Sequence, residues 1–191
     1  FDNPNLLNAI YTPGADDVFN GSVNLTLIAY GIGSCVEVTD DITLNITTLP
    51  TANAGVDGEI CEDDTYTVNG NVTNDSGNLW TTSGDGVFDS PTLLNAIYTP
   101  GANDVLSGSV VLSLTATGNG SCGQDVDVLT LSINPLPVVD AGFDGEICAD
   151  GTYTLNGTVA NASSNLWTTS GDGVFDNPNL LNAIYTPGAD D

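Results

Sequence analysis

The sequence predicts an all-β protein built from tandem two-sheet sandwich modules of about 87 residues, with about seven strands in each module. Three features lead to this prediction: an internal repeat, short segments in which apolar and polar residues alternate, and turn residues between those segments. No segment shows the apolar stripe with a 3.6-residue period that marks an amphipathic helix. Sheets are therefore expected throughout the chain.

The internal repeat covers the whole chain. The segment FDNPNLLNAIYTPGADD at 1–17 returns as FDSPTLLNAIYTPGAND at 88–104 and again, unchanged, at 175–191, so both offsets are 87 residues. The same offset relates Trp80 to Trp167. Repetition at a fixed period is typical of an array of small units rather than of one large domain.

Module boundaries are expected where strand-like runs meet prolines and small residues, at Pro50 and at Pro137. Residues 51–137 then form one complete Ig-like module. Residues 1–50 form the C-terminal part of the preceding module, and residues 138–191 form the N-terminal part of the following one. Because the first and last 17 residues repeat the same piece, we expect the chain to be a window in a longer array.

Period-two alternation and turn residues place the strands of the complete module. The expected strands are a short leading strand within 52–61, TYTVNG at 65–70, NLWTTSG at 78–84, VFD at 87–89, LNAIYTP at 94–100, SVVLSLTAT at 109–117 and DVDVLTLSI at 125–133. The last two form the clearest hairpin, because only GNGSCGQ separates them. Pro100, Gly101 and Gly108 are expected to shape a crossover between the two sheets.

Trp80, its counterpart Trp167, and Tyr98 are predicted to anchor the core. Each lies in an alternating segment, where an aromatic side chain usually packs between sheets. Stacking of Trp80 on a sugar is the alternative interpretation.

The charge of the chain excludes several partners. There are 25 acidic residues and no Lys, Arg or His, which gives a net charge of −25. A surface without cations cannot neutralise phosphates, so nucleic acid and anionic lipid headgroups are disfavoured. The apolar runs are only a few residues long, so no membrane insertion is expected. No cofactor is required by the sequence, but such a surface attracts divalent cations, chiefly calcium or magnesium.

Acidic residues near the module boundaries are the candidate calcium ligands: Asp57, Glu59, Asp140 and Asp144. Calcium needs six to eight oxygen ligands that converge on one point, and a boundary with a neighbouring loop could supply them. No EF-hand loop is present. The alternative is that these acids are solvated turn residues with diffuse counterions.

Two cysteines occur in each repeat, with Cys35 matching Cys122 and Cys61 matching Cys148. Four cysteines without histidine or a CxxC motif argue against zinc and favour disulfides formed in an oxidising compartment. The partners stay uncertain, because the expected strand layout places Cys61 near the first hairpin and Cys122 in the last, at opposite ends of an Ig-like module. Cys61 could pair with Cys122 inside one module, or the first cysteine of one module could pair with the second cysteine of the next; free thiols are the third alternative.

Catalysis is not expected. Without His or Lys, a nucleophile has no neighbouring base to activate it, and only a pair of carboxylates could act. We therefore expect this protein not to be an enzyme.

The motifs AGxDGEIC, LWTTSGDGVF, AIYTPGADD and GSVxLxLTA resemble PKD/Ig-like tandem repeats of giant cell-surface adhesin or filament proteins of gliding bacteria that use type IX secretion. The resemblance covers the whole chain and implies an extracellular, cell-surface stalk module. It implies neighbouring repeats of the same protein as partners, with surface glycans bound through a distal tip. It carries over no catalytic or binding residue.

Two functions are consistent with these features. The first is a structural repeat module of an extracellular filament or adhesin stalk, strung end to end. The second is a module that binds carbohydrate or another surface ligand through exposed loops such as GNGS at 118–121.

Overall fold

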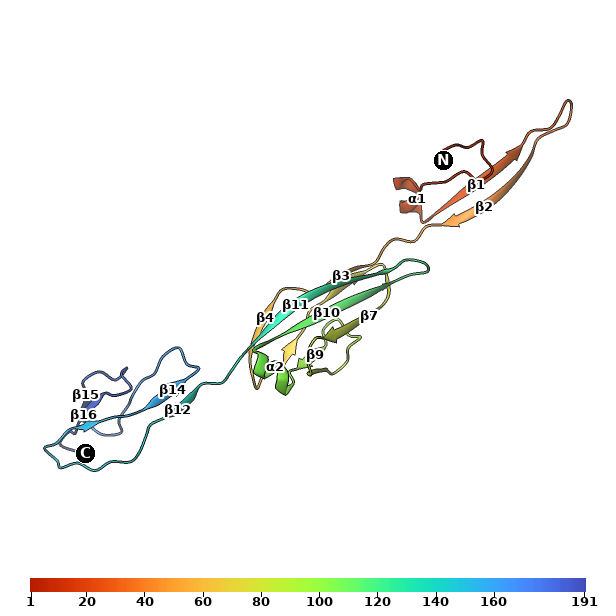
Figure 1. The fold of residues 1–191 in the computed structure, drawn as a ribbon. Helices are drawn as coiled ribbons and strands as arrows, with labels where there is room; N and C mark the ends of the chain where they lie inside the picture. Colours follow the sequence, from red (N-terminus) through yellow and green to blue (C-terminus); the bar gives the residue numbers. More distant parts are fainter.

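The structure is a computed structural model that describes all 191 residues. Three bodies lie in a row along one long axis (Figure 1). They are named here the first module (residues 1–50), the middle module (51–137) and the last module (138–191). The chain passes between them at the first joint, residues 46–50, and at the second joint, residues 135–137.

The middle module contains nine strands and one short helix. These are β3 (Thr51–Asn53), β4 (Gly58–Cys61), β5 (Tyr66–Thr67), β6 (Asn71–Thr73), β7 (Asp75–Thr82), β8 (Val87–Phe88), β9 (Ile97–Thr99), α2 (Ala102–Ser107), β10 (Ser109–Gly118) and β11 (Gln124–Asn134). Nine strands replace the expected seven because the leading segment forms two strands, β3 and β4, and because β6 was not expected. The segment expected as a strand at 65–70 is a strand only over the two residues of β5.

Two layers make up this module, so the predicted all-β sandwich is confirmed. The larger sheet has the strand order β4-β11-β10-β7, and two smaller sheets have the orders β3-β6 and β5-β9-β8. Strand β4 pairs with β11 in parallel, whereas β10 pairs with both of its neighbours in antiparallel fashion. The predicted hairpin is present, with Val111 opposite Thr130 and Thr117 opposite Gln124.

Alternation along β10 and β11 builds the core, because every second side chain faces the smaller sheets. Four inward leucines are at most 1% exposed: Leu112, Leu114, Leu129 and Leu131. Trp80 from β7 and Tyr98 from β9 lie in the same buried cluster. Phe88 connects them, with its ring centroid 5.9 Å from that of Trp80 and 4.9 Å from that of Tyr98.

The crossover before β10 is helical, which the sequence did not predict. Helix α2 has six residues, too few for an apolar stripe to repeat. Gly101 occupies its N-cap and Gly108 its C-cap, where φ is 71°. A left-handed C-cap favours glycine, so these two residues delimit a helix instead of shaping an extended crossover.

Each flanking module contains only part of this pattern. The first module has α1 (Ala15–Asn20), β1 (Ser22–Ala29) and β2 (Val38–Asn45), which match α2, β10 and β11. The last module has β12 (Val138–Asp140), β13 (Tyr153–Thr154), β14 (Thr158–Ala160), β15 (Val174–Phe175) and β16 (Ile184–Thr186), which match the N-terminal strands of the middle module. No helix in the structure is both long and apolar enough to cross a membrane.

Candidate functional site: the joints between modules

An asparagine with an unusual backbone conformation secures each joint. Asn74 has φ 54°, and its side-chain Nδ2 donates to the carbonyl oxygen of Leu49 at 3.2 Å. At the second joint, Asn161 has φ 55° and donates to the carbonyl oxygen of Leu136, also at 3.2 Å. Asparagine tolerates the left-handed region better than most residues. The two joints thus have the same contact, one repeat apart.

The hairpin loop between β10 and β11 reaches back to the first joint. Asn119 Nδ2 donates to the carbonyl oxygen of Asn74 at 3.0 Å, and Cys122 Sγ donates to that of Thr47 at 3.4 Å. Figure 1 shows this hairpin extending toward the linker that follows β2. The loop named above as a candidate ligand loop, residues 118–121, therefore contacts the joint.

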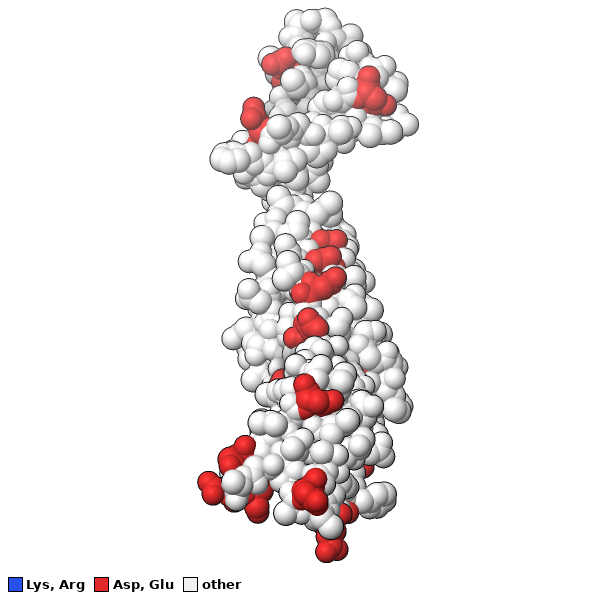
Figure 2. Space-filling model, turned by 90° about the vertical axis from the view of Figure 1, so that its left-hand side faces the viewer, with Lys and Arg blue, Asp and Glu red and all other residues white.

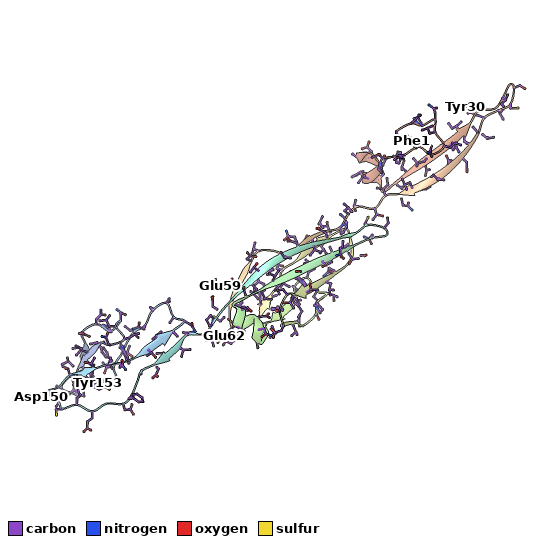
Figure 3. The ribbon with its side chains drawn as sticks, in the orientation of Figure 1. Phe1, Tyr30, Glu59, Glu62, Asp150 and Tyr153 are labelled. Carbon is purple, nitrogen blue, oxygen red and sulfur yellow. The ribbon has the colours of Figure 1, made fainter.

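Cys61 lies at the opposite end of the middle module. It stands opposite Asn134 in the parallel pairing of β4 with β11, and the next backbone N–H, that of Glu62, donates to the Asn134 carbonyl at 2.9 Å. Glu59 and Glu62 accordingly lie beside the second joint in Figure 3.

A bond between Cys61 and Cys122 of the same module is incompatible with this arrangement. The eleven residues of β11 separate the two cysteines, and at roughly 3.4 Å per residue they lie on the order of 35 Å apart. Bonded half-cystines need Cα atoms within about 7 Å. All four cysteines are free thiols in this structure; Cys35 lies in the loop that follows β1, and Cys148 follows β12 in the last module.

Carboxylates attach the leading segment of the middle module to β11. Asp125 accepts a hydrogen bond from the backbone N–H of Ala52 at 2.9 Å, and Asp127 accepts one from Ala54 at 2.8 Å. In the reverse direction, Asp57 accepts from the N–H of Thr130 at 2.7 Å. Each pair is 73 residues apart in sequence, so residues 51–61 run alongside β11 in one direction for its whole length. A row of acidic side chains marks one face of this module in Figure 2.

The predicted calcium ligands do not converge. Asp57 binds a backbone amide, Glu59 accepts from the side-chain amide of Asn134, and Asp140 accepts from the backbone N–H of Gly142 at 2.8 Å. Asp144 lies in the last module, in the segment that follows β12. No group of three or more His, Cys, Asp or Glu side chains is arranged to hold a metal ion. Calcium binding stays a prediction without a preformed site.

A buried carboxylate that was not predicted from the sequence holds the crossover of the middle module. Asp104 is 2% exposed and accepts hydrogen bonds from Tyr98 Oη at 2.6 Å and from the backbone N–H groups of Asp85, Gly86 and Gly101. Burial opposes the charged form, but these donors outweigh it, and the pKa of Asp104 falls below its ordinary value. Burial, then the bond to Asp104, raise the pKa of Tyr98 to about 12.

The same tyrosine–aspartate pair recurs in both flanking modules. Tyr11 donates to Asp17 and Tyr185 donates to Asp191, and the backbone N–H of the intervening glycine also donates to each carboxylate. This recurrence, six residues apart in all three copies, was the sequence signal that could have identified Asp104.

Cavities lie in both flanking modules, where part of the pattern of the middle module is missing. One of about 60 Å³ lies against Trp167 and Leu181 in the last module, and one of about 360 Å³ lies against Leu27 and Ile42 in the first. Their walls are counterparts of residues that form the core of the middle module. The chain has neither His nor Lys to act as a base.

Comparison with known proteins supports the fold assignment. No family model and no curated protein matches the sequence. Among solved structures, the N-terminal eight Ig domains of Down syndrome cell adhesion molecule isoform 1.30.30 match with a TM-score of 0.53 and 13% identity, over 89% of this chain and 27% of that chain.

Two other multidomain structures match less well. Extracellular cadherin domains 3–6 of protocadherin gamma B2 give a TM-score of 0.45 and 12% identity, over 91% of this chain and 52% of that one. A three-Ig-domain structure of titin gives 0.39 and 13%, over 88% and 65%. The chain spans less than two thirds of each of these structures, and identities this low show the fold alone. The chain is an all-β protein of tandem Ig-like modules.

Proposed function

We propose that this chain is a structural repeat segment of an extracellular filament or adhesin stalk, with its modules strung end to end on the cell surface. The observation that carries the proposal is the repeated joint: Asn74 and Asn161 make the same hydrogen bond to the preceding linker, one repeat apart. A contact that recurs with the period of the sequence gives each linker the same attachment to the module that follows it, which favours a constant orientation between neighbours. Constant orientation is what a spacer requires.

Charge and chemistry support the same proposal. With a net charge of −25 and no cation, modules repel one another unless a specific contact holds them, and this repulsion favours an extended array. The acidic side chains are distributed along the module rather than gathered into a pocket (Figure 2). The partners of each module in this proposal are the neighbouring repeats of the same protein.

Small-angle X-ray scattering tests the spacer role. We expect an elongated particle whose maximum dimension grows by about 40 Å, the length of an eleven-residue strand with its joint, for each 87-residue repeat added. In the double variant Asn74→Gly and Asn161→Gly, glycine keeps the backbone conformation but loses the contact, so the particle becomes more flexible and its scattering curve loses the rod-like region. A wild-type particle that is compact, or that grows irregularly with added repeats, contradicts the proposal.

A glycan-array screen of the full chain distinguishes the alternative function. A pure spacer binds no glycan above background. Saturable binding that Asn119→Ala weakens, with an unchanged circular dichroism spectrum, would instead assign a ligand site to the hairpin loop.

A further inference from the structure

We propose that a disulfide joins Cys61 of each module to the counterpart of Cys122 in the module that follows it, so that neighbouring modules are covalently linked across every joint. The geometry of the two joints points to this bond, and the inference holds whether or not the array forms a filament.

The second cysteine of the middle module, Cys122, lies beside the joint that precedes the module. Cys122 belongs to the hairpin loop of the middle module, yet its Sγ contacts the carbonyl oxygen of Thr47, which lies just beyond the end of β2 in the first module. This cysteine therefore touches the C-terminal end of the module before its own.

The first cysteine of the middle module, Cys61, lies beside the joint that follows the module. Cys61 is paired with Asn134 at the C-terminal end of β11, and the carbonyl oxygen of Asn134 accepts the N–H of Glu62 at 2.9 Å. The side chain of Cys61 is exposed, so a partner can reach it from the next module.

Thr47 and Asn134 occupy equivalent positions in their modules. They are 87 residues apart. The residue before each donates its N–H to the helix C-cap glycine at 2.9 Å: Ile46 to Gly21, and Ile133 to Gly108. The shared asparagine contacts described above show that the two joints are also alike on their other side.

At each joint, both cysteines are therefore expected beside the same carbonyl group. At the second joint, the cysteine of the following hairpin would contact the Asn134 oxygen, as Cys122 contacts that of Thr47. The sulfur of that hairpin cysteine and the backbone nitrogen of Glu62 would then both contact the Asn134 oxygen, so the distance between them is at most the sum of the two hydrogen-bond lengths. Cys61 immediately precedes Glu62. Half-cystines bond when their Cα atoms lie within about 4.4–6.8 Å, and we infer that the two cysteines come within this range.

The chemistry is thiol–disulfide exchange. One cysteine thiolate attacks a disulfide oxidant, such as oxidised glutathione or a disulfide oxidoreductase, and forms a mixed disulfide. The second thiolate displaces the oxidant's remaining sulfur. Two protons and two electrons leave the cysteines, and the oxidant is reduced to two thiols. The last module of this chain contains no counterpart of the β10–β11 hairpin, so Cys61 has no such partner within residues 1–191.

The test uses the full chain extended by a second copy of residues 105–191, which continues the repeat after Asp191 and completes the last module. The protein is oxidised with glutathione disulfide, its free thiols are blocked, and it is digested with an Asp-specific protease, because a chain without Lys or Arg gives trypsin no cleavage site. We expect a cross-linked peptide that contains Cys61 and a hairpin cysteine.

Two matched variants identify the hairpin, since its two copies have the same sequence. Cys122→Ser in the original copy should leave the yield of the cross-linked peptide unchanged, whereas the same substitution in the added copy should lower it more than tenfold. The opposite pattern would show a bond inside one module and overturn the proposal. Absence of any cross-link, in an extended chain that melts cooperatively in its reduced state, would overturn it as well.

Discussion

The middle module and the first module contain the same hairpin, but only the middle module buries it. Leu114 and Leu129 are at most 1% exposed, whereas their counterparts Leu27 and Ile42 are 60% and 64% exposed. Strand pairing is the same in both, because β1 and β2 repeat the register of β10 and β11. The hairpin is therefore a local structure, whereas the core needs the strands of residues 51–104.

The last module shows the converse. It has the N-terminal strands without the hairpin, and Trp167 lines an open cavity where Trp80 is 1% exposed. Even the indole N–H differs: that of Trp167 donates to the carbonyl of Leu180 at 3.0 Å, whereas that of Trp80 is buried without a partner. Burial of the second tryptophan therefore depends on strands that only a complete module supplies.

Completing the last module should have the largest effect. Adding a copy of residues 105–137 after Asp191 supplies the missing hairpin, and we expect this module to gain on the order of 5 kcal/mol of stability, as a small independent domain does. Hydrogen–deuterium exchange of residues 153–160, whose sequence is unique in the chain, should slow by several orders of magnitude. As a control, Leu112→Asp and Leu114→Asp in the added copy should abolish this protection. Unchanged exchange in the completed chain would contradict the conclusion that the last module lacks a closed core because it lacks the hairpin.

Removal of each tryptophan should have unequal effects. Trp80→Ala creates a cavity in a closed core and should cost about 4 kcal/mol, whereas Trp167→Ala should cost under about 1 kcal/mol in this chain. Urea denaturation followed by far-ultraviolet circular dichroism measures both. Equal losses would mean that the last module already buries Trp167.

Substitution of the buried aspartate comes next. Asp104→Asn turns an amide NH₂ toward several donors and should cost about 2–3 kcal/mol. The matched change Asp17→Asn, at an exposed site with fewer partners, should lower the stability much less. Thermal denaturation at neutral pH distinguishes the two variants. Equal melting temperatures would contradict a special role for the buried aspartate.

Alkaline pH should have the smallest effect. Because the folded-state pKa of Tyr98 is raised from 10.0 to about 12, its contribution is fully present below pH 10 and is lost as the pH rises through 12. At pH 11 the expected loss is about 1 kcal/mol, seen as a melting temperature several degrees lower. Tyr98→Phe should reduce this dependence; an identical dependence in that variant would assign it to another group.

The sequence was sufficient to predict the parts of the fold that depend on alternation. The hairpin of β10 and β11 is long and strictly alternating, so its position followed from the pattern, and the structure adds its register. Helix α2 could not be predicted, because six residues between two glycines hold no period.

The polar contacts were less predictable for a different physical reason. Asp57, Asp125 and Asp127 looked like surface acids, because nothing in a sequence shows that a distant segment presents backbone N–H groups to them. Asp104 was hidden in the same way, because two of its donors, the backbone N–H groups of Asp85 and Gly86, lie far from it in the sequence. The positions of Cys61 and Cys122 at opposite ends, by contrast, followed from the expected strand layout, and the structure adds the contact with Thr47.

The parallel course of residues 51–61 beside β11 has a mechanical consequence. From Cys122 to Cys148, about 27 residues advance along the long axis without turning back, through β11, the second joint and β12. With the proposed disulfides formed, such nearly taut segments would be joined end to end and would carry the tension in a pulled array. The remaining strands of each module would bear no load. An oxidised array would then resist stretching, whereas a reduced one would lengthen as its modules unfold one by one.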